Sequence, residues 1–170
     1  RELYLDNESG HVLGGLGCGA AGTVRVEAAG RTYEVRLPKM GEGENGVVFD
    51  FEGSPGAVLK LAKPREYSRA HIRDECEITS FFVKHGVPVP AVLEHDRYGS
   101  FCVKERLAGE SLAVLYEGLG PAECPRHRRV REAVCRFCDQ LIELFGREPH
   151  AKTSISPNNI FVVEEGNACR

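Results

Sequence analysis

Three glycines at fixed spacing, followed by a lysine and a glutamate, could together bind a phosphate group. The glycines form the pattern Gly41-x-Gly43-x-x-Gly46. Backbone that lacks Cβ atoms can approach a phosphate closely and offer N–H donors to it. Further along the chain come Lys60, whose ammonium group could bind phosphate oxygens, and Glu75, whose carboxylate could hold that ammonium in place.

The segments around the glycines indicate a hairpin. A dinucleotide-binding turn needs a helix directly after the glycines, but here the apolar segment Val47–Phe51 continues as a strand. The alternation of residues predicts three antiparallel strands, at Tyr33–Met40, Val47–Phe51 and Ala57–Leu61, with the glycines in the first hairpin. Lys60 then lies in the third strand.

A helix and two more strands are expected next. Apolar or small residues recur every three or four positions in Tyr67–Lys84, which predicts a helix that carries Glu75. His85-Gly86 and the following proline end it. Strands are expected at Ala91–Glu94 and Ser100–Glu105. This makes five strands and one helix.

The second half of the chain has helical periodicity. Helices are predicted at Leu112–Leu119 and Arg129–Phe145. The apolar stripe expected along the second of these helices consists of Val130, Val134, Phe137, Cys138, Leu141, Ile142 and Phe145. Because Cys135 and Cys138 fall in this apolar pattern, we expect buried thiols there in place of a zinc or redox C-x-x-C site.

The composition is that of a globular protein without a strong electric field. The chain has 170 residues, 42% of them hydrophobic, a formal net charge of -3 and seven cysteines. We expect a monomer that binds no nucleic acid, because opposite charges are interspersed. No apolar run approaches the roughly 20 residues that cross a bilayer, and we expect no leader. The expected location is the cytoplasm, with reduced cysteines.

The order of these motifs resembles the protein-kinase-like superfamily, in particular its small bacterial, effector-type kinases and pseudokinases. The resemblance implies an α+β fold: an antiparallel five-stranded N-lobe with one helix, plus a reduced helical C-lobe. It divides the chain into an N-terminal β extension at 1–32, the N-lobe at 33–107, and at 108–170 a reduced or truncated C-lobe that holds a segment similar to a catalytic loop.

The resemblance also implies a site for ATP. In such proteins the glycine loop covers the phosphates and the strand lysine, paired with the helix glutamate, contacts the α- and β-phosphates. Apolar strand residues cover the adenine, and the backbone of the segment between the lobes recognises it. The residues at these positions are Gly41, Gly43, Gly46, Val48, Val58, Lys60, Glu75, Lys104, Glu105 and Leu107.

The segment 152–162 resembles the catalytic loop H-R-D-L-x-x-x-N, with two consequences. Asn159 stands at the position of the metal-binding asparagine, so the implied metal is Mg²⁺, although the chain contains no D-F-G aspartate. Ser154 stands where the catalytic aspartate belongs. A neutral serine hydroxyl cannot act as the carboxylate that accepts the substrate proton.

Three functions follow from this resemblance. The first is phosphoryl transfer from ATP to a protein Ser/Thr hydroxyl with an atypical catalytic loop, in a protein similar to effectors that bacteria deliver into host cells. The second is a pseudokinase that regulates a protein partner without chemistry, which Ser154 favours. The third is a small-molecule phosphotransferase of the aminoglycoside or choline type, suggested by the segment Glu105–Gly109.

Overall fold

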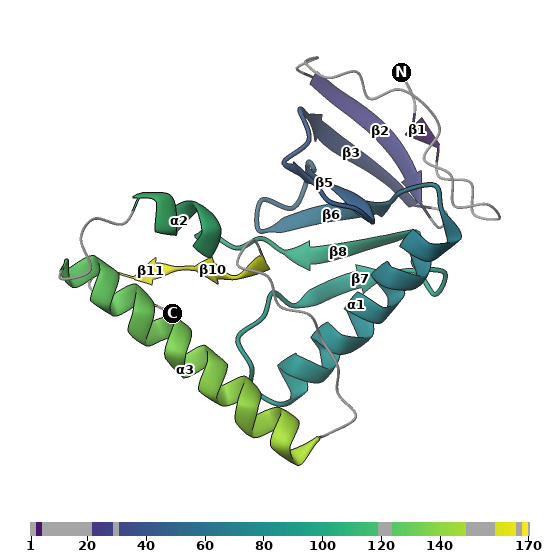
Figure 1. The fold of residues 1–170 in the computed structure, drawn as a ribbon. Coiled ribbons are helices and arrows are strands. Elements are labelled where there is room, and N and C mark those ends of the chain that lie inside the picture. Colours follow the sequence, from purple (N-terminus) through teal and green to yellow (C-terminus); the bar gives the residue numbers. More distant parts are fainter. Residues whose placement is uncertain are drawn as a thin grey trace. The chain divides into compact units, whose positions relative to one another are not determined.

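The chain forms two units, which are described separately. The computed structural model describes residues 3–4, 22–28, 31–118, 124–148, 159–165 and 168–169. The first unit consists of Arg1–Phe81 with Pro90–Arg106, and the second of Phe82–Val89 with Leu107–Arg170. Figure 1 shows the elements of both. The division of the chain at 32/33 and 107/108 stays a prediction.

A five-stranded antiparallel sheet is the centre of the first unit, as predicted. Its strand order is β4-β5-β6-β8-β7. All four strand pairs in it are antiparallel. The strands are β4 (Gly41–Glu42), β5 (Gly46–Asp50), β6 (Ala57–Ala62), β7 (Val92–His95) and β8 (Phe101–Glu105).

The prediction for the first strand of the glycine hairpin was wrong. The segment Tyr33–Met40 is not one strand: β3 covers Arg31–Leu37 and pairs with β2 (Gly22–Ala28) in another sheet, whose third strand is β1 (Leu3–Tyr4). The hairpin strand is the short β4. Pro38 follows β3 directly, and since proline has no N–H to donate to a ladder, it separates the two strands.

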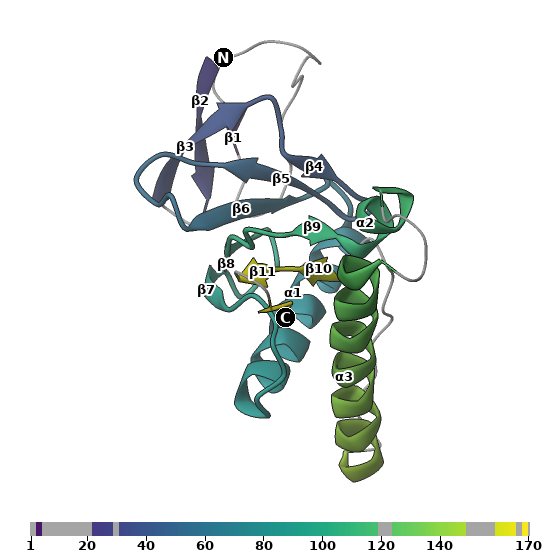
Figure 2. The same ribbon diagram turned by 90° about the vertical axis from the view of Figure 1, so that its left-hand side faces the viewer.

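The β2–β3 hairpin packs on one face of the five-stranded sheet. Val26 and Val35 from the hairpin are buried with Phe49 and Leu59 in one core cluster, and the β2, β3, β5 and β6 ribbons lie side by side in Figure 2. Tyr33 adds a polar attachment, because its hydroxyl donates to Glu94 Oε1 at 3.0 Å. Burial and this hydrogen bond raise the pKa of Tyr33 to about 12.

Helix α1 covers the other face of the sheet. It runs from Glu66 to Lys84, close to the predicted range, and Figure 1 shows it along β8 and β7. Ile72 and Cys76 pack there against Ala62 and Cys102. The turn before β8 fits only glycine: Gly99 has φ +73°, and a Cβ on it would lie 2.0 Å from the Arg69 carbonyl oxygen of α1.

Two helices and short strands form the described part of the second unit. Helix α2 covers Leu112–Gly118 and α3 covers Pro125–Arg147. Strands β9 (Glu110–Ser111) and β10 (Phe161–Val162) are antiparallel, as are β11 (Glu164–Glu165) and β12 (Ala168–Cys169). The core cluster consists of Leu112, Leu115, Val130, Ala133 and Val162.

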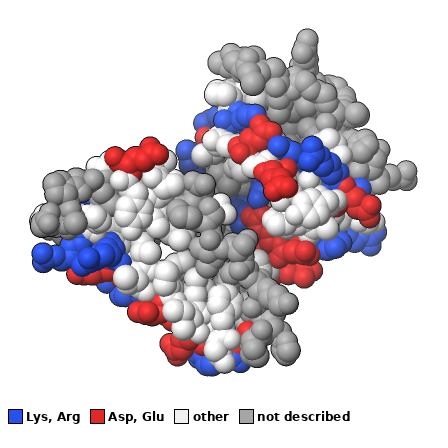
Figure 3. Space-filling model, in the orientation of Figure 1, with Lys and Arg blue, Asp and Glu red and all other residues white. Residues whose placement is uncertain are grey.

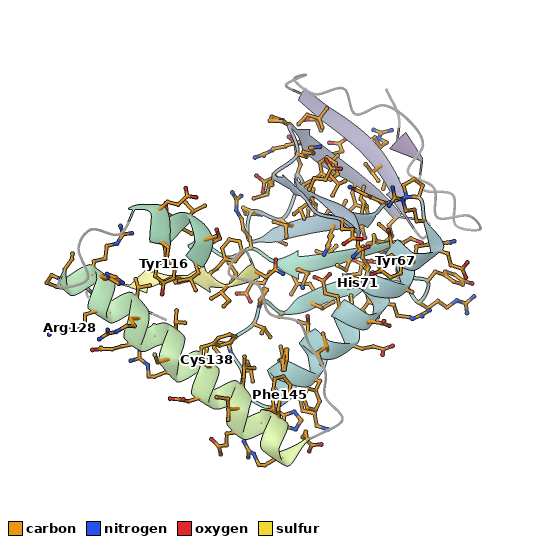
Figure 4. All side chains as sticks on the ribbon, in the orientation of Figure 1. Tyr67, His71, Tyr116, Arg128, Cys138 and Phe145 are labelled. Carbon is orange, nitrogen blue, oxygen red and sulfur yellow. The ribbon has the colours of Figure 1, made fainter. Side chains whose placement is uncertain are left out.

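The apolar face of α3 differs from the predicted stripe. Ala133 and Leu144 are buried, whereas Ile142 is 70% exposed. Phe145 does pack, with its ring 6.2 Å from that of Phe82 (Figure 4). The prediction of buried thiols was also wrong, because both cysteines of the C-x-x-C pair, including Cys138, are exposed. The sequence predicted the helical period of the apolar residues, but which side of α3 is buried depends on the segments that pack against the helix.

Charged groups of both signs alternate on the face seen in Figure 3. Among the described residues, no helix is long and apolar enough to cross a membrane. The thiols of five cysteines are free, namely those of Cys76, Cys102, Cys124, Cys135 and Cys138. Over the same part of the chain, no group of three or more His, Cys, Asp or Glu side chains could hold a metal ion.

Candidate functional site

An ion pair joins the strand lysine to the helix glutamate. The Lys60 ammonium on β6 donates to Glu75 Oε2 on α1 at 2.5 Å. Both side chains are mostly enclosed, with exposures of 22% and 25%. Residues alternate between the faces of a strand: Leu59 points into the core beneath the β2–β3 hairpin, so Lys60 points to the face that α1 covers. Glu77, two residues further along α1, is exposed.

A second lysine binds the same carboxylate. Lys104 Nζ on β8 donates to Glu75 Oε1 at 2.8 Å, and the Lys104 side chain is 13% exposed. Lys104 is opposite Val58, and Cys102 is opposite Lys60, in the β6–β8 register. Directly opposed residues share a face of the sheet. Lys104 was expected from the sequence to act only through its backbone. Its side-chain contact with Glu75 could not be predicted, because the strand register that brings the two lysines together is not local information.

The charges decide the ionisation of Glu75. Burial by itself opposes the charged carboxylate, but the ammonium groups of Lys104 and Lys60 outweigh it, so the pKa of Glu75 is lowered from its ordinary value of 4.5. Nearby, Cys76 and Cys102 face each other in the core. The thiol of Cys76 and burial both raise the pKa of Cys102. The hydrogen bond with Cys102 lowers the pKa of Cys76, so Cys102 is the thiol that stays protonated beside the charged cluster.

The third glycine of the loop lies directly over Lys60. A Cβ on Gly46 would be 2.8 Å from the Leu61 carbonyl oxygen and 3.1 Å from Lys60 Cε. A Cβ on Gly41 or Gly43 would meet nothing within 4 Å. Of the three loop glycines, Gly46 is therefore the one that packing inside the protein requires, while Gly41 and Gly43 border open space that a phosphate could enter.

Hydrogen bonds and ion pairs hold the glycine hairpin in place. The Gly43 N–H donates to the Gly46 carbonyl at 2.9 Å, so this amide is already used within the turn. Glu42 pairs with Lys63 at 2.7 Å and also with Lys39. Hydrogen bonds from these lysines, Lys39 first, lower the pKa of Glu42 to about 2. The hairpin is thus anchored to the chain that follows β6.

Of the residues expected around adenine, two valines lie on the sheet face that carries Lys60. Val48 is opposite Lys60 in the β5–β6 pairing, and Val58 shares the face of Lys60 as its alternate neighbour. Both valines are half-buried. Glu105 is exposed, and its N–H donates to the Ala91 carbonyl at 2.9 Å. Leu107 is half-buried and belongs to the second unit.

The catalytic-loop residues are described only in part. Asn159 is exposed, next to Ile160, whose carbonyl accepts the Leu112 N–H at 2.7 Å. Ser154 lies outside the described residues. Since Asn159 is the single metal ligand that the resemblance assigns here, the described residues do not assemble a magnesium site, and no step below depends on a metal.

In the five-stranded sheet, a helix carboxylate binds a strand lysine beneath a glycine hairpin. This arrangement defines the small lobe of a protein-kinase-like fold. The α+β prediction is therefore confirmed. The model of the phosphotransferase enzyme family APH matches residues 21–149. This stretch is more than half of the chain, so the chain belongs to this family.

Two solved structures similar to the chain are of APH(2")-IIa. In the ternary complex with streptomycin and ATP, the identity is 20% over 52% of this chain and 29% of that chain, with a TM-score of 0.40. In the gentamicin complex, the identity is 21% over 51% and 28%, with a TM-score of 0.41. The chain therefore spans less than a third of the length of those proteins. No curated protein matches it.

Proposed function

We propose that this chain binds ATP and takes part in transfer of its γ-phosphoryl group to a hydroxyl of a small molecule. The observation that carries the proposal is the Lys60–Glu75 ion pair at 2.5 Å, since this pair positions the lysine that binds the α- and β-phosphates in kinases. Gly41 and Gly43 would lie over the phosphates, where a side chain has open space. Val48 and Val58 would cover the adenine.

In the transfer, the acceptor oxygen bonds to the γ-phosphorus and the bond from that phosphorus to the bridging oxygen breaks. ADP leaves and the acceptor proton is released. Family membership favours a small-molecule acceptor over the protein hydroxyl expected from the sequence. Streptomycin and gentamicin, which appear in the complexes of APH(2")-IIa, are the first acceptors to assay, with a protein substrate such as casein beside them.

The second candidate function is nucleotide binding without transfer. Ser154 favours it, because a general acid or base contributes about 10²- to 10⁴-fold to rate and a serine cannot replace the carboxylate. In that case the protein acts as a scaffold for a partner. Ser154→Asp separates the two functions.

The test is a thermal-shift titration with ATP, with and without Mg²⁺, followed by transfer of labelled phosphate. Lys60→Ala should abolish the shift, while Lys84→Ala, at an exposed lysine of α1, should keep it. Lys60→Ala should fold, because Lys104 still neutralises Glu75. Transfer by the unmodified chain that Lys60→Ala removes supports the first function, and transfer only by Ser154→Asp supports the second. No shift with ATP would contradict both.

A further inference from the structure

Glu75 has more positive charge around it than one ion pair requires. Lys60 binds its Oε2 and Lys104 binds its Oε1. Two ammonium groups against one carboxylate leave one positive charge in excess. Each lysine has an oxygen of its own, so one can leave the carboxylate without disturbing the contact of the other.

The two lysines are not equivalent. Lys60 lies under the glycine hairpin, since a Cβ on Gly46 would be 3.1 Å from Lys60 Cε. Lys104 comes from β8, and its side chain is the more enclosed, with 13% exposed against 22% for Lys60. Lys60 is therefore positioned to bind a phosphate, whereas Lys104 is positioned to remain paired with Glu75.

We propose that Lys104 is a positioning residue: it remains bound to Glu75 as a permanent counterion and leaves the Lys60 ammonium free to bind nucleotide phosphates. This inference rests on the proposed function. If a mostly buried carboxylate lost its only counterion, the protein would be strongly destabilised. With Lys60 alone, movement of the ammonium toward a phosphate would leave Glu75 unpaired. With Lys104 in place, the carboxylate keeps a partner in both states.

The variants separate this role from a direct contact and from a structural one. Lys104→Met removes the charge and keeps the aliphatic stem, while Lys104→Arg keeps the charge. The dissociation constants of ATP, ADP and adenosine are measured by calorimetry for the unmodified chain and each variant. Lys84→Met is the matched control at an exposed lysine.

We expect Lys104→Met to weaken binding of ATP and ADP by about tenfold, a coupling of ordinary size for residues in one ion-pair network, and to leave adenosine within about twofold. Lys104→Arg should restore most of the affinity. In a Glu75→Gln background no carboxylate competes for Lys60, so Lys104→Met should then change ATP affinity by less than about twofold. A purely structural role would weaken all three ligands together.

Besides equal weakening of all three ligands, three results would overturn the inference. If Lys104→Met binds ATP as the unmodified chain does, Lys104 has no such role, although the proposed function stands. If its effect is undiminished in Glu75→Gln, the ammonium acts on the phosphates directly. If the unmodified chain binds no nucleotide, the proposed function fails and this role fails with it. Should Lys104→Met not fold, Lys104→Gln takes its place, because it keeps a donor for Glu75 without the charge.

Discussion

Glu75 joins three elements of the first unit. Its carboxylate comes from α1, one ammonium from β6 and the other from β8. Both bonds are charge-assisted, which makes them stronger than neutral hydrogen bonds. The residue is therefore expected to matter for stability before any ligand is bound, and this contribution depends on pH.

The stability given by Glu75 should disappear in acid. Because the folded pKa of Glu75 lies below 4.5, its contribution is complete above pH 4.5 and is lost as the pH falls through the folded pKa. At pH 7 we expect Glu75→Gln to lower the free energy of unfolding by about 1 to 3 kcal/mol. Urea unfolding from pH 7 to pH 3 should show this difference shrinking. Glu77→Gln, at an exposed glutamate, is the control, and a difference independent of pH would contradict the assignment.

The glycines of the hairpin should respond differently to alanine. Gly46→Ala places a methyl group 2.8 Å from the Leu61 carbonyl oxygen, so it should lower the free energy of unfolding by about 1 to 3 kcal/mol, as overpacking does. Gly43→Ala meets open space and should change stability by less than about 0.5 kcal/mol. We expect Gly43→Ala to weaken ATP binding nonetheless. Denaturant unfolding and ATP titration of both variants test this, and equal losses of stability would refute it.

At the scale of elements, each face of the five-stranded sheet is covered by a different partner. The β2–β3 hairpin covers the face with Leu59, and α1 covers the face with Lys60. Each face of the sheet therefore carries a packed layer, which holds the backbone of the lysine and the glutamate that meet on the α1 face. This packing fixes the backbone positions of Lys60 and Glu75, while the Lys60 side chain can still turn toward a phosphate.

The leucines of this sheet test the packing. Leu59 on β6 is fully buried, while Leu93 on β7 is 58% exposed. Leu59→Ala should lower the free energy of unfolding by about 2 to 5 kcal/mol, because it removes core contacts and leaves a cavity. Leu93→Ala, the same change in the same sheet, should cost less than about 1 kcal/mol. Guanidinium unfolding measures both free energies. Similar losses in the two variants would mean that the β2–β3 hairpin does not bury the sheet face that carries Leu59.

At the scale of the whole molecule, the residues assigned to phosphate binding all belong to the first unit, whereas Asn159 belongs to the second. Ligand binding stabilises the conformation that binds. We therefore expect a bound nucleotide to stabilise the first unit and a metal bound at Asn159 to stabilise the second.

Hydrogen exchange should distinguish these contributions. With ATP alone, we expect slower exchange in segments 41–62 and 101–105, with segment 130–147 of α3 as the internal comparison. If Asn159 contributes to a metal site, added Mg²⁺ should slow exchange in 159–162 as well. Mass spectrometry of digested peptides measures both. Protection confined to the second unit would contradict the assignment of Lys60 and the glycines to the nucleotide.

Local pattern in the sequence was enough to predict the hairpin glycines, four of the five strands of the antiparallel sheet and the helix with Glu75, while the contact of Glu75 with Lys60 was implied by the resemblance to kinases. Alternation and helical period report which residues share a face, and these features depend on neighbours in the chain. What needed the tertiary structure was non-local: the packing of the β2–β3 hairpin on the five-stranded sheet, the side of α3 that is buried, and the contact of Lys104 with Glu75. Each depends on which distant segment packs against an element, and packing overrides local preference.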